Sequence, residues 1–206
     1  MYIPENFAET DTLTLHEFVR QHNFATLVTP QDSVLFANHL PLLLDSSIGT
    51  HGALVGHMAR NNPQWRDFAA GTEVLVMFHG PHAYVSPAWY ESNPLVVPTW
   101  NFMVVHAYGV ARILSEDELV EALHQLVDEN EKVLPQPWKL DLSQEMRERM
   151  LGAIVGFEIL LSRIEGKFKL SQNRAEQDQR NVVAKLSQSA HGKDVAHWMG
   201  KKLERK

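Results

Sequence analysis

The pattern of apolar and polar positions predicts many short strands, with helices inserted singly between them. An apolar face at helical spacing predicts a helix over residues 11–22, in which Thr14 and Glu17 have capping-box spacing. Apolar runs bounded by turn-forming residues predict strands over residues 24–29, 34–44, 53–58 and 73–78. The first three of these strands are expected to form an antiparallel meander.

The middle of the chain combines a helix start, a proline-containing stretch and a long apolar segment. Asn62-Pro63 predicts the start of a short helix. Two prolines in residues 80–90 suit a strand with a bent, exposed end at the edge or rim of a sheet. A long strand is expected over 99–114, followed by a helix that Ser115 and Glu118 open as a capping box.

The last third is predicted to add one central strand and three helices. A linker with two prolines leads to a short charged helix over 143–150 and then to an apolar strand over 153–164. Two amphipathic helices are expected beyond Gln177, separated near Gly192. This order favours a mainly β fold, a predominantly antiparallel β-barrel with flanking helices. The sequence has no Gly-rich dinucleotide fingerprint and no P-loop, which argues against a Rossmann site or an NTPase.

The composition is that of a globular protein. Of 206 residues, 44% are hydrophobic and 21% are charged. Cysteine is absent, which excludes disulfides, thiolate nucleophiles and iron–sulfur clusters, so any redox chemistry needs a bound cofactor. The sequence starts without the basic segment of an export signal and has no apolar run long enough to cross a bilayer, so a cytoplasmic protein is expected.

Charge is distributed unevenly along the chain. Residues 167–206 contain ten Lys and Arg against four Asp and Glu, whereas residues 1–166 carry a net charge of −12. Such an asymmetry indicates a basic tail that contacts nucleic acid, a phosphate or an acidic face of the same molecule.

Metal and serine chemistry have little support in the sequence. His79 and His82 lie in a strand–turn context where side-chain directions are not set for chelation, and hydrogen-bonded histidines explain them more simply, so no metal is expected. Ser86 lies outside a Gly-x-Ser-x-Gly elbow, which argues against a hydrolase.

Two polar clusters suit an anionic ligand. In residues 56–63 a strand ends and a helix begins, so backbone N–H groups and Arg60 can converge on a phosphate. A capped helix with a solvent-facing arginine explains the same residues equally well. Farther along, alternation places Lys167, Lys169 and Ser171 on one side of an extended segment. A solvated edge strand is the alternative there.

Eight stretches occur in the same order as in a known protein family. They are residues 1–4, 24–29, 39–41, 56–65, 80–87, 97–101, 105–109 and 165–174, including GHMARNNPQW at 56–65 and KLSQNR at 169–174. These stretches resemble the PaiB-type negative transcriptional regulators, which are classed among the FMN-binding split-barrel proteins.

The resemblance implies a six-stranded antiparallel split β-barrel over residues 1–174, working as a homodimer with flavin sites built from both chains. A basic helical extension is expected over 175–206. The FMN-binding residues that the resemblance implies are His39, Leu40, Pro41, His57, Met58, Ala59, Arg60, Trp100, Asn101, Lys167, Lys169, Ser171 and Gln172. Related flavin oxidases have an Arg-Lys pair at the phosphate turn, whereas this chain has only Arg60, so Lys167 or Lys169 would supply the second charge.

Three functions stay open at this point. The first is a regulator of transcription that contacts DNA through the basic tail, although no helix-turn-helix pattern stands out. The tail cations are Lys185, Lys193, Lys201, Lys202, Arg205 and Lys206. The second is a flavin-dependent oxidoreductase or flavin-binding sensor, and the third is a haem protein with an axial histidine.

Overall fold

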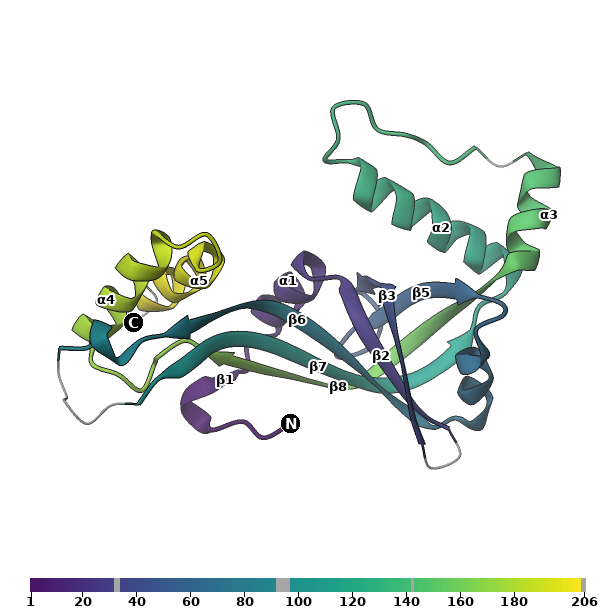
Figure 1. Ribbon diagram of the computed structural model, residues 1–206. Coiled ribbons are helices and arrows are strands. Elements are labelled where there is room, and N and C mark those ends of the chain that lie inside the picture. The colour runs from purple at the N-terminus through teal and green to yellow at the C-terminus, as the bar shows by residue number, and fades with distance from the viewer. Residues whose placement is uncertain (32–33, 92–96, 142, 205–206) are drawn as a thin grey trace. The chain divides into compact units, whose positions relative to one another are not determined.

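The computed structural model describes residues 1–31, 34–91, 97–141 and 143–204 (Figure 1). The tail cations Arg205 and Lys206 lie outside the described residues. The α-helices are α1 (Thr12–Gln21), α2 (Glu116–Glu131), α3 (Gln144–Ala153), α4 (Glu176–Ser187) and α5 (Lys193–Glu204). The 3-10 helices are η1 (Glu5–Phe7), η2 (Pro63–Ala70) and η3 (Pro87–Trp89). The strands are β1 (Ala8–Glu9), β2 (Phe24–Gln31), β3 (Val34–Pro41), β4 (Leu43–Asp45), β5 (Ala53–Ala59), β6 (Glu73–Val85), β7 (Thr99–Ile113) and β8 (Ile154–Lys169).

The strands form one sheet, with the order β3-β2-β6-β7-β8-β5-β4 and with β1 beside β8. The mainly antiparallel β fold with flanking helices is confirmed. The sheet has eight strands where the resemblance implies six, and the short strands β1 and β4 account for the difference. The single strand expected over 34–44 is divided at Leu42, because β3 pairs with β2 whereas β4 pairs with β5.

The chain folds into two compact units. Unit 1 comprises Met1–Phe18, His79–His106 and Glu165–Lys206, and unit 2 comprises Val19–Phe78 and Ala107–Ile164. Strands β6, β7 and β8 run through both units. The domain boundary expected at residue 174 stays a prediction.

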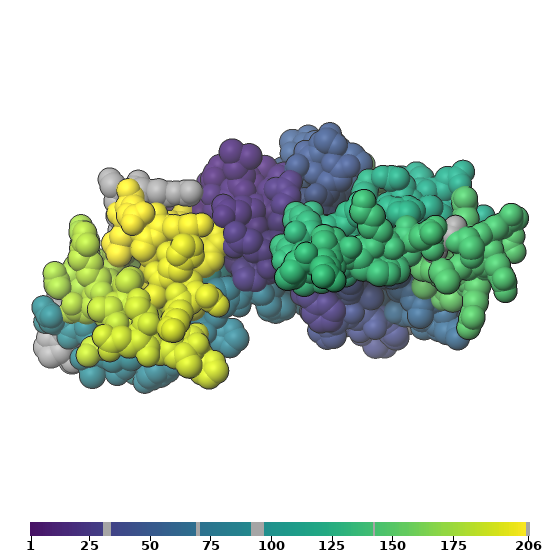
Figure 2. Space-filling model, turned by 90° about the horizontal axis from the view of Figure 1, so that it is seen from above, coloured from purple at the N-terminus to yellow at the C-terminus, as the bar shows by residue number. Residues whose placement is uncertain are grey.

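The core of unit 1 joins its N-terminal residues to the C-terminal helices. The ring of Phe168 lies 5.1 Å from that of Phe18 and 5.5 Å from that of Trp198 on α5. Gly80 of β6 allows this packing, because a Cβ atom there would lie 2.5 Å from the Phe18 ring. Helices α4 and α5 pack side by side at the yellow end of the colour scale (Figures 1 and 2).

The core of unit 2 lies on the inner faces of β2, β5 and β8. Phe157 of β8 is buried against Phe68 of η2, with 5.3 Å between the ring centroids. A smaller cluster joins α2 to α3 through Leu119, Leu123 and Leu151.

Local sequence signals set most element boundaries. Ser115 and Glu118 form the expected capping box of α2. At α1, Asp11 rather than Thr14 is the cap, because its carboxylate accepts the backbone N–H of Thr14 at 3.0 Å. The strand expected to end at residue 78 continues to Val85.

Candidate functional site

The residues implied as flavin ligands fall into two groups, one in each unit. In unit 2, His39–Pro41 end β3, residues 57–59 end β5 and Arg60 follows β5. Strands β3 and β5 contact each other. Gly56 allows the close approach, because a Cβ atom there would lie 2.5 Å from the Leu42 side chain. His39 shares a hydrogen bond of 3.0 Å with the Thr26 hydroxyl and stacks on the exposed ring of Phe24.

The turn after β5 is held by the fold of unit 2. Met58 is buried and Ala59 is exposed, while burial lowers the pKa of His57. The Arg60 guanidinium donates three hydrogen bonds of 2.7–2.8 Å to backbone carbonyls. The acceptors belong to residues 151, 152 and 154, where α3 ends. Arg60 therefore stabilises the negative end of the α3 dipole.

The backbone N–H groups of this turn are also engaged. Arg60 N donates to the Ala153 carbonyl at 2.8 Å and Asn62 N to the Ala59 carbonyl at 2.9 Å, while the Asn62 side chain accepts the N–H of Gln64. Within the described part of the chain, the Nη1 group of Arg60 makes no hydrogen bond. That group is one donor of the turn that stays open to an anion.

In unit 1, Trp100 and Asn101 point to opposite faces of β7, as neighbours on a strand do. Trp100 is exposed, whereas Asn101 is buried. The Asn101 amide exchanges two hydrogen bonds with the Ser171 hydroxyl, at 3.0 and 3.1 Å, and donates to the Met199 sulfur at 3.3 Å. Asn101 and Ser171 thus bind each other inside the unit.

Residues 170–172 turn away from the line of β8. Ser171 was expected beside the lysines, but it is buried, because β8 ends at Lys169 and Ser171 takes a left-handed backbone with φ of 65°. Gln172 donates its amide N–H to the Phe168 carbonyl and accepts the Leu170 N–H at 2.7 Å. These side chains fix the backbone of the segment that carries the lysines.

The side-chain amines of Lys167 and Lys169 lie near aromatic rings. The Lys167 amine donates to the Tyr2 carbonyl at 3.0 Å and lies 5.5 Å from the centre of the Phe102 ring. The Lys169 amine donates to the Trp100 carbonyl at 2.7 Å and to the Thr99 hydroxyl. Burial, followed by repulsion from Lys167 and Arg174, lowers the pKa of Lys169. These cations suit an anion that would relieve their mutual repulsion.

A hollow of about 650 Å³ opens on unit 1 beside Trp100. Its walls include His79 and His82 from β6, and Trp100, Phe102 and Val104 from β7. We call these five residues the Trp100 hollow. The rings of His82 and Trp100 lie 5.9 Å apart. Phe102 and Val104 were missed in the sequence, because alternation along β7 places them on the face of Trp100 but does not identify the neighbouring strand that completes the hollow.

Comparison with known proteins identifies the family. The family model described as "Putative FMN-binding domain" matches residues 1–163. The chain belongs to this FMN-binding family. It is also 42% identical, over 208 residues and 100% of the chain, to "Protease synthase and sporulation protein PAI 2" of Bacillus subtilis, of which it covers 99%. The PaiB-type resemblance is confirmed.

Solved structures share the fold of this FMN-binding family member. The flavocytochrome Anf3 from Azotobacter vinelandii is 15% identical, with a TM-score of 0.62, over 84% of this chain and 75% of that one. The FAD and haem binding protein from Mycobacterium smegmatis is 14% identical, with a TM-score of 0.61, over 83% of this chain and 78% of that one. At these identities the likeness establishes the fold alone.

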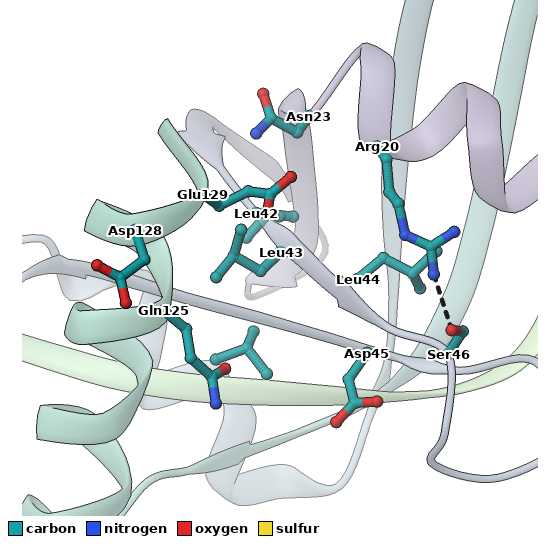
Figure 3. A pocket seen from close by; sticks show the side chains of 11 residues that line it. Arg20, Asn23, Leu42, Leu43, Leu44, Asp45, Ser46, Gln125, Asp128 and Glu129 are labelled. Carbon is teal, nitrogen blue, oxygen red and sulfur yellow. Dashed lines mark hydrogen bonds between the residues drawn. The ribbon is translucent and has the colours of Figure 1, made fainter. Parts of the chain in front are cut away.

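A second hollow, of about 430 Å³, fits the phosphate of an FMN-binding protein poorly. It lies in unit 2 beside α2, over a floor of leucines from residues 42–44 (Figure 3). The hollow is lined by three carboxylates, those of Asp45, Asp128 and Glu129, and by one guanidinium, that of Arg20. The Arg20 guanidinium donates a hydrogen bond to the Ser46 hydroxyl at 2.7 Å. This excess of carboxylates repels a phosphate. The cations of unit 1 are the better anion seat.

In residues 1–31, 34–91, 97–141 and 143–204, no three His, Asp or Glu side chains gather as a set of metal ligands. None of the helices within these ranges is long and apolar enough to span a membrane.

Proposed function

We propose that the protein binds FMN as a homodimer and acts as a negative transcriptional regulator of the PaiB type. Membership of the FMN-binding family over residues 1–163 carries this proposal. The 42% identity to PAI 2 of Bacillus subtilis, over the whole chain, supports the choice of a PaiB-type role.

The side chains of both units suit the parts of FMN. The Nη1 group of Arg60 would bind the phosphate, joined by Lys167 or Lys169 of the second copy. Residues 39–41, His57, Met58 and Ala59 would line the site in one copy, and Trp100, Asn101, Ser171 and Gln172 would lie near it in the other. The bound flavin would supply electron transfer, which this cysteine-free chain lacks on its own.

Two measurements on the purified protein test this function. The absorbance spectrum, with mass spectrometry of the released ligand, is expected to identify oxidised FMN, either co-purified or bound after addition. Light scattering during gel filtration is expected to give the mass of two chains. A colourless protein that fails to bind added FMN would refute the flavin assignment, and a monomer would refute sites shared between copies.

The regulatory role is tested by DNA binding. Lys185 and Lys193 make no ion pair within the described residues, so they are the tail cations most available to phosphates. A salt-dependent gel shift with the protein's own promoter region is expected if the tail contacts DNA. If the protein does not retard this DNA at low ionic strength, the proposal that the tail binds DNA is refuted.

One observation favours a flavin-dependent oxidoreductase or sensor as the second candidate. Lys201 and Lys202 are engaged in ion pairs with Glu17 and Glu9, which reduces the positive charge the tail presents to DNA. A protein that binds FMN and gives no gel shift would support this candidate. The cytoplasmic location stays a prediction for both functions.

A further inference from the structure

Helix α3, which leads directly into β8, depends on Arg60 for its place in unit 2 (Figure 1). All ten residues of α3 are described, and among them only Leu151 is buried, in the small cluster shared with α2. The last turn of the helix contains no basic residue to offset the negative end of its dipole, and the Arg60 side chain supplies that charge. Because a short helix with little buried surface is unstable on its own, loss of this contact would loosen its end.

The hydrogen bonds from Arg60 to the end of α3 occupy the part of the guanidinium that a phosphate needs. Nε donates to the Gly152 carbonyl at 2.8 Å, and Nη2 donates to the carbonyls of Leu151 at 2.8 Å and Ile154 at 2.7 Å. Both hydrogens of Nη2 are thereby used. A guanidinium holds a phosphate by two parallel bonds, through Nη1 and Nη2 or through Nε and Nη2. Since Nη2 belongs to both arrangements, a two-bond contact with phosphate requires it to leave α3.

We propose that Arg60 exchanges the end of α3 for the phosphate when FMN binds, so that flavin binding releases the last turn of this helix. The inference rests on the proposed function and adds regulation to it, because α3 then opposes FMN binding and its release reports that the site is filled. A charged phosphate is a stronger acceptor than a neutral carbonyl, which favours the exchange.

The side chain of Arg60 can change partners while its backbone stays in place. Its N–H donates to the Ala153 carbonyl at 2.8 Å, and the pairing of β5 with β8 extends to Ala59 and Ile154. The sheet therefore fixes the start of the side chain between two possible acceptors. Only the guanidinium and the helix end have to move.

Competition is reciprocal, so a substitution that stabilises α3 is expected to weaken FMN binding. Gly152 lies in the last turn of α3, and a Cβ atom there would meet no atom within 4 Å. Gly152→Ala therefore favours the helical form of this turn without a clash. In a titration with FMN we expect this variant to raise the Kd about threefold. The Kd for riboflavin, which lacks the phosphate, is expected to stay unchanged.

Gly200→Ala is the matched control for Gly152→Ala. Gly200 lies in helix α5, and a Cβ atom there would also meet no atom within 4 Å. The control is expected to bind FMN and riboflavin as the unaltered protein does. Thermal unfolding of both variants verifies that the fold is retained.

Amide hydrogen exchange of residues 148–153 measures the release of α3 directly. Saturating FMN is expected to accelerate exchange of these amides severalfold, because the helix end loses the guanidinium that holds it. Saturating riboflavin is expected to leave their exchange unchanged. A role of Arg60 in holding the fold alone would give no acceleration by FMN.

The outcomes distinguish this inference from the proposed function. If the unaltered protein binds FMN, and FMN slows the exchange of residues 148–153 or leaves it unchanged, the competition is wrong while the FMN assignment stands. Equal affinity of Gly152→Ala and Gly200→Ala for FMN would also overturn the inference. If the unaltered protein does not bind FMN, both fall.

Discussion

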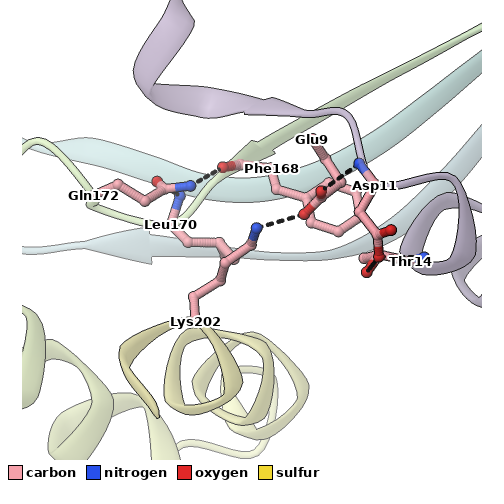
Figure 4. A network of polar contacts seen from close by, with 7 residues as sticks. All are labelled: Glu9, Asp11, Thr14, Phe168, Leu170, Gln172 and Lys202. Carbon is pink, nitrogen blue, oxygen red and sulfur yellow. Dashed lines mark hydrogen bonds and ion pairs between the residues drawn. The ribbon is translucent and has the colours of Figure 1, made fainter. Parts of the chain in front are cut away.

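The ion pair between Lys202 and Glu9 gives a sharp test of how the C-terminal helices are attached in unit 1. Lys202, in the last turn of α5, donates to the Glu9 carboxylate of β1 (Figure 4). The other oxygen of that carboxylate accepts the backbone N–H of Asp11 at 3.0 Å. The side chain of Glu9 is 6% exposed and that of Lys202 is 27% exposed. Lys202→Ala therefore leaves a buried carboxylate without its cation.

The magnitude follows from the burial of the pair. Breaking a fully buried pair costs about 3–5 kcal/mol, and breaking an exposed pair costs about 0–1 kcal/mol. Because Lys202 is partly exposed, we expect Lys202→Ala to lower the free energy of unfolding by about 2 kcal/mol. At about 2–4 °C for each kcal/mol in a chain of this size, the Tm is expected to fall by about 4–8 °C.

The neighbouring residue supplies the control. Lys201→Ala removes the same charge from the same helical turn, but its pair with Glu17 spans 3.4 Å, with side chains 36% and 46% exposed. We expect a cost below about 1 kcal/mol in urea unfolding. Adding Glu9→Gln to Lys202→Ala removes the buried charge and is expected to recover part of the loss. Equal stability of the two alanine variants, within about 0.5 kcal/mol, would refute the reasoning.

Arg60→Ala removes three hydrogen bonds to the end of α3 and is expected to lower the free energy of unfolding in urea by about 1–2 kcal/mol, with faster amide exchange in that helix. The control is Arg66→Ala, which removes an exposed arginine and is expected to change the stability little. Asn101→Ala leaves the buried Ser171 hydroxyl without its partner and is expected to cost about 1–3 kcal/mol; no change in the urea midpoint would contradict this. Burial lowers the pKa of His57 in the folded chain. As the pH falls below about 6.5, His57 is therefore protonated in the unfolded chain before it is protonated in the folded chain. Stability is expected to fall as the pH drops below 6.5 toward the folded-state pKa, with a smaller fall for His57→Gln, as measured by denaturant unfolding at several pH values.

Local signals made much of the fold predictable from sequence. The capping box at Ser115 and the Asn62-Pro63 start depend only on residues within one helical turn, and both caps form. The division of 34–44 into β3 and β4 was missed, because it depends on which strand lies opposite each half. Alternation of apolar residues identifies a strand and does not identify its partner.

The candidate site was harder to predict, because residue type does not reveal which partner a side chain takes. Arg60 suits a phosphate by its chemistry, yet three of its donor contacts are made to carbonyls near residues 151–154, about ninety positions away in sequence. Ser171 departs from simple alternation because its left-handed backbone turns it inward. The Trp100 hollow depends on β6 and β7 lying side by side, which no single motif encodes.

The uneven charge of the chain resolves into two classes of cation with different roles. Lys201 and Lys202 are neutralised by Glu17 and Glu9, so the acidic face of the same molecule accounts for this part of the basic tail. Lys167 and Lys169 have no such partner in the described residues and lie beside exposed aromatic rings. An unneutralised pair of amines gains most from a ligand that brings both a negative charge and a flat apolar surface. A phosphorylated flavin meets both conditions, whereas duplex DNA would leave the aromatic rings of the Trp100 hollow uncovered.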